Sequence, residues 1–403
     1  MQLSHAILCD EDAWVCISCV RSDIVKTLGG GIAQIFGAVL RHLFAPDGHN
    51  LHNAGVRIAF SDGSCSRVRA SLRMILQDGG AHKQVFMVKG ESGLKQCILC
   101  RNLYSKDSGV VGEDGESILT CSHIRACELD FAIDDDVMGT VRRLAEIART
   151  KPAKELKLRE MAAGFNHNRF NLLLDADLGG TVVKPISNFA HDWMHTLCVH
   201  GVMNTISYLL LFTLQGSGVK NAAADIAEFI MDGWALPCRH GAKRGCESLA
   251  DILSASRWKS SCKGKYLKCQ ASELMALYPI VAWYVHAVYM RAGVCVLECT
   301  AFMLCCEVLD MLTQVARGTV SPGDLSGAVD RFLSACDAAG WRDFMHPEFH
   351  WLIHLHIELG RFGTLYTCWV HERKHKMVKR PAGSQASLYH NFGTCIAICI
   401  YLC

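Results

Sequence analysis

The chain has 403 residues, of which half are hydrophobic and a fifth are charged, with a formal net charge of +2. This length leaves room for two or three domains, and the composition is that of a globular protein with a sizeable core. The near-neutral charge excludes nucleic-acid binding through a global positive field, so such binding would have to use local basic clusters.

The first part of the chain shows an alternation of strand and helix signals. Residues 13–20 (AWVCISCV) and then 23–31 (DIVKTLGGG) alternate like strands, and 32–44 (IAQIFGAVLRHLF) has helical spacing. A strand is next predicted at 55–60 (GVRIAF), followed by a helix at 66–78 (SRVRASLRMILQD) and a strand at 83–90 (KQVFMVKG). This order predicts an α/β sheet.

The character of the sequence changes at Cys97, and residues 97–136 are loop-rich, acidic and cysteine-bearing. Helical periodicity then dominates. The chain is therefore predicted to divide into an α/β half (1–96), a cysteine-rich insertion (97–136), a mainly helical insertion (137–345), a closing helical block (346–380) and a tail (381–403).

An apolar stretch at residues 277–312 is long, but His286, Arg291, Glu298 and Glu307 interrupt it. It predicts a buried helix pair with a turn near residues 291–293 rather than a membrane span. We therefore expect no membrane partner.

Cysteine is frequent, at 22 residues, and the start of the chain lacks a basic region followed by an apolar run. We expect no signal peptide, so the thiols are predicted to be reduced, and most of them to be small buried hydrophobes. Cys97 and Cys100 lie in CILC, the spacing of a zinc knuckle, and two members of the later set Cys121, His123 and Cys127 would complete a structural, tetrahedral zinc site.

Asp62 follows the predicted strand in IAFSDGSC and precedes the predicted helix. A carboxylate at the carboxyl end of a strand in an open α/β sheet can hold a divalent cation. The alternative is a simple turn, because Asp-Gly is a common turn pair.

Asp192 and His195 lie three residues apart in HDWMH, so they share a helix face if the segment is helical. They could bind a metal, or the carboxylate could orient the imidazole. The alternative is that Asp192 caps the start of a helix.

The closing block carries His346, His350 and His354 at four-residue spacing, without the Glu of a His-Glu-x-x-His zinc protease helix. Further on, Glu372 precedes a basic strip made of Arg373, Lys374, Lys376, Lys379 and Arg380. The glutamate and the strip are either a solvated ion-pair face or a metal-binding carboxylate beside a phosphate-binding surface.

In order and spacing, IAFSDGSCSRVRASL, KQCILCRN, HDWMH and the closing block HPEFHWLIHLHIELGRFG…HERKHKMVK resemble a transposase of the RNase H-like DDE superfamily, over residues 5–380. The likeness is to the Kyakuja–Dileera–Zisupton (KDZ) and Plavaka group, related to the CACTA transposases. It implies a partial RNase H-like α/β sheet with a zinc-knuckle insertion and a large helical insertion, in a nuclear protein.

The resemblance also implies a mechanism, in which carboxylates hold two Mg²⁺ (or Mn²⁺) ions that cleave and join DNA strands. Asp62 would be the second carboxylate and Glu372 the third, with Glu273 as the alternative third acid, while Asp192 and His195 would support the site. The basic strip would contact the transposon ends, and a homodimer is a further partner to test. His350 and His354 would then be packing or strand-contacting residues.

The pattern departs from the family at its start, because Asp10, Asp12 and Asp23 do not stand at a strand end in the register of the first catalytic aspartate. We therefore expect an N-terminally truncated copy. Two functions stay open: a transposase, and a non-catalytic, zinc-stabilised nucleic-acid-binding protein derived from a transposable element. A cysteine oxidoreductase is disfavoured, because no long helix starts at CILC.

Overall fold

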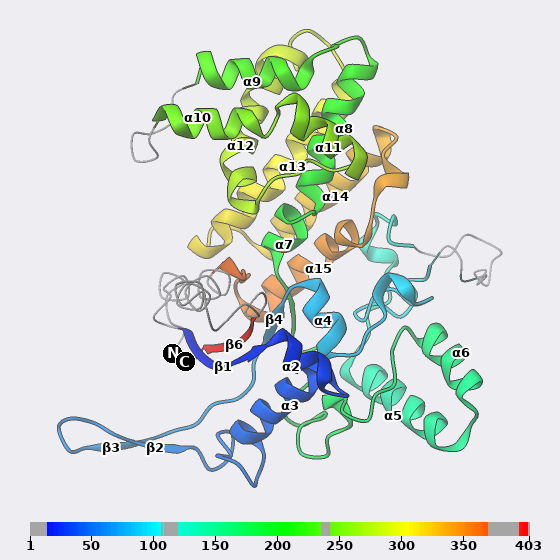
Figure 1. The fold of residues 1–403 in the computed structure, drawn as a ribbon, viewed down its shortest axis with the longest axis vertical. Coiled ribbons are helices and arrows are strands. Elements are labelled where there is room, and N and C mark those ends of the chain that lie inside the picture. Colours follow the sequence, from blue (N-terminus) through cyan, green and yellow to red (C-terminus); the bar gives the residue numbers. More distant parts are fainter. Residues whose placement is uncertain (1–13, 106–107, 109–119, 235–241, 370–394, 402–403) are drawn as a thin grey trace. The chain divides into compact units, whose positions relative to one another are not determined.

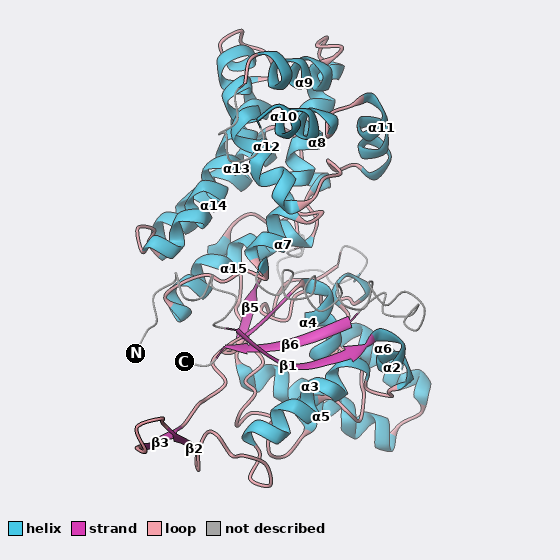
Figure 2. Cartoon of the chain, turned by 60° about the vertical axis from the view of Figure 1, so that its left-hand side comes forward, coloured by secondary structure: helices cyan, strands magenta, loops and turns pink. Residues whose placement is uncertain are grey.

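The structure is a computed structural model that describes residues 14–105, 108, 120–234, 242–369 and 395–401. It is a mixed α/β protein made mostly of helices (Figures 1 and 2). The chain divides into two compact units, which we describe separately. The first contains residues 1–120, 128–191 and 367–403, and the second contains residues 121–127 and 192–366.

All described strands belong to the first unit: β1 (Trp14–Arg21), β2 (Val56–Ala59), β3 (Cys65–Val68), β4 (Ile75–Gln77), β5 (Phe189–His191) and β6 (Cys395–Tyr401). They form three two-stranded sheets: β1 pairs antiparallel with β6, β2 antiparallel with β3, and β4 parallel with β5. Within the described residues no sheet has more than two strands, so the RNase H-like sheet is not shown.

The helices of the first unit are α2 (Ser22–Thr27), α3 (Gly31–Phe44), α4 (Gly79–Val85), α5 (Asp134–Thr150) and α6 (Ala153–Ala163), with short 3-10 turns at η2 (Gly90–Ser92) and η5 (Leu172–Leu174). Another 3-10 turn, η4 (Ala126–Glu128), contains the point in the chain at which residues 121–127 of the second unit are followed by residue 128 of the first.

The predicted elements at residues 13–20, 32–44 and 55–60 are confirmed as β1, α3 and β2. The strand-like reading of 23–31 is wrong, since α2 begins there at Ser22. The helix predicted at 66–78 is also wrong, because that segment pairs as β3 and then as β4.

Residues 83–90, which were predicted to form a strand, instead form the end of α4 and a following turn. The reason is local, because the Asp78 side chain accepts a hydrogen bond from the Ala81 backbone N–H at 2.6 Å. This N-cap starts a helix at the Gly-Gly pair, in spite of the β-branched and aromatic residues that follow.

The second unit is helical among its described residues: α7 (Trp193–Cys198), α8 (Val202–Gly216), α9 (Ala222–Asp232), α10 (Ala242–Asp251), α11 (Ala255–Gly264), α12 (Ala271–Tyr284), the π-helical η7 (Val285–Met290), α13 (Val296–Gln314), η8 (Val315–Arg317), α14 (Pro322–Ala338), η9 (Arg342–Phe344) and α15 (Pro347–Phe362). Its core contains Phe302, Phe332 and Phe349, which are fully buried. The rings of Phe332 on α14 and Phe349 on α15 stack at 6.2 Å between centroids.

The predicted helix pair at residues 277–312 is confirmed as α12 with η7, then α13. The chain turns between them at Gly293, whose positive φ of 68° suits glycine. In the described part of the chain, only Trp193–Gly216 is long and apolar enough to cross a membrane, and 78% of its apolar window is buried inside the fold. Such burial is typical of a core helix.

Candidate metal centre

Cys97 and Cys100 lie on a buried loop of the first unit. Neighbouring backbone holds this loop, because Ala132 N–H donates to the Leu99 carbonyl at 2.9 Å and Arg101 N–H donates to the Asp130 carbonyl at 2.7 Å. Inside the loop, the Leu99 N–H donates to Cys97 Sγ at 3.3 Å. A backbone N–H aimed at sulfur stabilises the thiolate form that binds metals.

Lys95 adds a positive charge near this pair. Burial lowers the pKa of Lys95, and the charges of Cys97, Asp136 and Cys100 act in the opposite direction. The loop thus places two thiols side by side, with a backbone N–H directed at Cys97 Sγ and the Lys95 side chain nearby.

His350 and His354 lie one turn apart on α15 in the second unit, and each is only 1% exposed. Their Nε2 atoms are 2.9 Å apart and the ring planes are nearly perpendicular, at 87°. Two imidazole nitrogens on one tetrahedral zinc stand about 3.3 Å apart, given Zn–N bonds of about 2.05 Å. The pair is therefore close to the spacing that a shared zinc requires.

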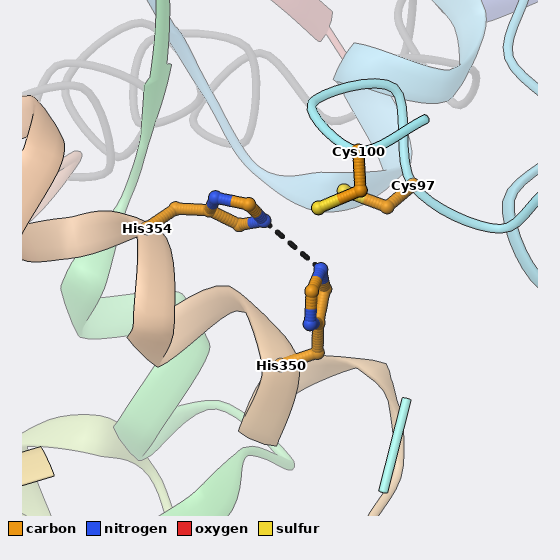
Figure 3. A group of neighbouring side chains, drawn as sticks. All are labelled: Cys97, Cys100, His350 and His354. Atoms are coloured by element: carbon orange, nitrogen blue, oxygen red, sulfur yellow. Dashed lines mark hydrogen bonds between the residues drawn. The ribbon is translucent and has the colours of Figure 1, made fainter. Parts of the chain in front are cut away.

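Cys97, Cys100, His350 and His354 form a group that could hold a metal ion (Figure 3). One ligand atom from each lies within 4.8 Å of the others, and all four residues are buried. Two sulfur and two nitrogen donors are consistent with a structural zinc site.

The other predicted zinc ligands, Cys121, His123 and Cys127, are not members of this group. Cys127 is exposed, and His123 Nε2 is 3.1 Å from the Arg125 carbonyl oxygen. Of the predicted set, the structure thus brings only Cys97 and Cys100 into the candidate centre.

A sequence signal for the other two ligands was visible. Along α15, His350, His354 and Glu358 follow one another at four-residue steps, and each is 1% exposed. Buried polar side chains are costly unless they are satisfied, so three on one helical face indicate a functional surface. Spacing showed the shared face, but it did not show that the face is buried.

The buried Cys198, Cys299, Cys305, Cys306 and Cys336 of the second unit behave as small hydrophobic residues. All five are free thiols. Burial raises the pKa of Cys198 and Cys299 to about 12, so these thiols stay protonated.

Asp192 is fully buried at the start of α7, where it both caps the helix and contacts His195. Its carboxylate accepts a hydrogen bond from the Met194 N–H at 3.0 Å, which caps the helix. It also bonds His195 Nδ1, and thereby orients the imidazole. Asp192, His195 and Cys368 bring three more potential ligand atoms within 4.8 Å of one another.

We expect Asp192→Ala to lower the free energy of unfolding by about 2–4 kcal/mol, because it removes a buried cap and a buried partner of an imidazole. Asp192→Asn keeps the acceptor oxygen and should cost less. Urea unfolding measures both changes. The control is Asp324→Ala, which removes an exposed cap partner of Ser321 on α14. If Asp192→Ala and Asp324→Ala lower the free energy of unfolding equally, the burial of Asp192 makes no additional contribution to stability.

Asp62 is exposed at the tip of the β2–β3 hairpin. Phe60 N–H donates to the Ser64 carbonyl at 2.8 Å, and Gly63, at φ 82°, donates to the Phe60 carbonyl. The Asp62 carboxylate accepts from the Ser64 N–H at 2.8 Å, and hydrogen bonds from Ser64 lower its pKa. The expected strand-to-helix junction at Asp62 is therefore wrong, because a tight hairpin turn stands there.

Glu273 stands in the first turn of α12, where it accepts from the Gln270 N–H at 2.7 Å and pairs with Arg257 at 3.3 Å. This is a helix-capping role. Glu372 and the basic strip, Arg373, Lys374, Lys376, Lys379 and Arg380, lie outside the described residues.

Comparisons of the chain with protein-family models, with curated proteins and with solved structures find no match. The fold and the site thus define a class: a mixed α/β, mainly helical protein with a buried Cys₂His₂ group that could hold a metal ion.

Proposed function

We propose that this chain is a zinc-stabilised nucleic-acid-binding protein derived from a transposable element. The observation that carries the zinc part of the proposal is the buried group of Cys97, Cys100, His350 and His354. In this proposal the four side chains bind one structural Zn²⁺.

The donor set supports zinc over other divalent ions. Thiolates and imidazoles suit Zn²⁺, whereas Mg²⁺ and Ca²⁺ take oxygen ligands. Four protein ligands also leave no open coordination position for a substrate, so the ion would act in folding and not in catalysis.

The nucleic-acid part of the proposal rests on the order of motifs that resembles KDZ and Plavaka transposases and on clustered basic residues. The chain's near-neutral net charge makes such clusters necessary for binding a polyanion. Both supports are independent of the zinc group.

DNA strand cleavage and transfer is the second candidate function, with Mg²⁺ held by Asp62 and Glu372. The observation in its favour is the contact between the buried Asp192 carboxylate and Nδ1 of the partly exposed His195, which orients this imidazole. The position of Asp62, exposed in a hairpin turn, favours the non-catalytic candidate over this one.

One experiment separates the two functions. The purified full chain is incubated with end-labelled duplex DNA in Mg²⁺ or Mn²⁺, and both retention and nicking are measured. We expect DNA retention without metal-dependent nicking, because neither group of potential metal ligands in the described residues contains two carboxylates.

The same assay is run with Asp62→Ala and Glu372→Ala. If the native chain nicks DNA and each of the two substitutions abolishes this nicking, the second function replaces the first. A chain that neither retains nor nicks DNA would contradict both.

A further inference from the structure

The β2–β3 hairpin is an isolated, solvent-exposed ribbon of the first unit. Val56 pairs with Val68 and Ala59 with Cys65, and the loop of residues 61–63 joins the strands. Nearly every residue from 57 to 69 is exposed. In both views the ribbon extends away from α3 and α5 (Figures 1 and 2).

One face of the ribbon concentrates arginine. Arg57 on β2 stands directly opposite Arg67 on β3, so their side chains share a face. Arg69 follows Arg67 by two residues, and the aliphatic parts of the Arg67 and Arg69 side chains lie close to Gly55. A Cβ placed on Gly55 would come within 2.8 Å of Arg69 Cγ and 3.2 Å of Arg67 Cγ.

This arrangement leaves positive charge uncompensated within the protein. Like charges directly opposite one another destabilise a strand pair. Among the residues that the structure describes, no carboxylate forms an ion pair with Arg57, Arg67 or Arg69. The only acid of the hairpin, Asp62, is engaged by the Ser64 N–H of the turn.

We propose that this ribbon enters the major groove of duplex DNA and that Arg57, Arg67 and Arg69 contact it there. The inference rests on the proposed nucleic-acid binding and names the surface and the form of the ligand. A two-stranded ribbon fits the B-form major groove, which is about 12 Å wide. Four-residue strands are about 14 Å long, which is enough to follow the groove past several phosphates.

The shape of the groove distinguishes duplex DNA from duplex RNA as the ligand of the ribbon. The major groove of A-form RNA is deep and narrow, so side chains on a ribbon cannot enter it. Duplex DNA should therefore bind more tightly than duplex RNA of the same sequence. The other face of the ribbon carries the exposed apolar side chains of Ile58, Phe60 and Val68, and a protein partner on that face is the outcome to be distinguished.

The test compares four forms of the full chain, on a DNA duplex and on an RNA duplex of the same sequence: the native protein, the ribbon variant Arg57→Gln/Arg67→Gln/Arg69→Gln, the variant Phe60→Ser of the apolar face, and a control variant. The control, Arg142→Gln/Arg143→Gln/Lys157→Gln, removes the same charge from exposed positions on α5 and α6 of the same unit. Binding to each labelled duplex is measured by fluorescence anisotropy between about 50 and 300 mM salt. Circular dichroism checks that all four forms are folded.

We expect the ribbon variant to bind roughly 100-fold more weakly at 0.15 M salt and to lose about 2.7 from the slope of log K against log salt, as for three phosphate contacts. The control should keep most of the native affinity. Two results would overturn the inference: unchanged binding by the ribbon variant, or equal losses in both variants. Preference for duplex RNA, or loss of DNA binding in Phe60→Ser alone, would also overturn it. A native chain that binds no nucleic acid would instead contradict the proposed function itself.

Discussion

Replacing Cys97 and Cys100 with serine is expected to abolish the binding of one zinc ion per chain and to destabilise the fold strongly. Structural zinc sites contribute on the order of 10 kcal/mol of binding free energy, which becomes folding free energy when the unfolded chain has no site. Zinc content is measured by atomic emission on protein purified without chelator, and stability by urea unfolding with and without EDTA.

Two further variants decide which residues complete this site. His350→Ala/His354→Ala should lose zinc as completely as the cysteine pair, because all four residues belong to one buried group. Cys121→Ser/Cys127→Ser should retain the ion, although Cys121, His123 and Cys127 were predicted ligands. Zinc loss in this variant but not in the histidine variant would replace the proposed ligand set with the one predicted from the sequence.

Acidification is expected to destabilise the first unit through His82 on α4. The His82 imidazole is buried, stacks on Phe189 at 4.0 Å between centroids, and lies 2.9 Å from the Ala190 carbonyl oxygen through Nε2. Its Nδ1 atom has no hydrogen-bond partner in the described structure. Burial lowers the pKa of His82 to about 3, and nearby His191 contributes in the same direction.

The sign of the pH effect follows from this lowered pKa. The unfolded chain takes up the proton near pH 6.5, whereas the folded chain resists it down to about pH 3. The stabilisation is therefore complete above pH 6.5 and is lost as the pH falls toward 3. The loss is about 1.4 kcal/mol for each pH unit in this window.

The variant His82→Gln isolates the effect, because glutamine keeps an N–H donor for the Ala190 carbonyl and does not titrate. Between pH 7 and pH 4.5, the native chain should lose about 2–3 kcal/mol more unfolding free energy than the variant does. Both proteins carry the same candidate zinc ligands, so acid release of metal cancels in the difference. Parallel stability curves for the two proteins would show that His82 does not carry the effect.

Local spacing was enough to predict several parts of the molecule. Cys97 and Cys100 are two residues apart, so one loop must present both thiols, and the structure places them in the candidate centre. The apolar stretch at residues 277–312 predicted two helices with a turn, since its charges interrupt a membrane span but not a helix pair.

Errors arose where a segment's conformation depends on a distant or competing partner. The segment at residues 66–78 has helical periodicity, but its residues pair with β2 and with β5, and β5 lies more than a hundred residues away. At residues 83–90 the cap supplied by Asp78 outweighs the strand propensity of the residues that follow.

The amino-acid sequence by itself determined the local geometry: the thiol pair on its loop, the imidazole pair one turn apart on α15, and the cap at Asp192. Each of these depends on residues within four positions of one another, which backbone geometry alone brings together. Only the tertiary structure decided that His350 and His354 are buried beside one another as potential ligands and that His82 is kept neutral. Burial and the choice of partners depend on packing between segments far apart in the chain, and spacing along the sequence carries no information about that packing.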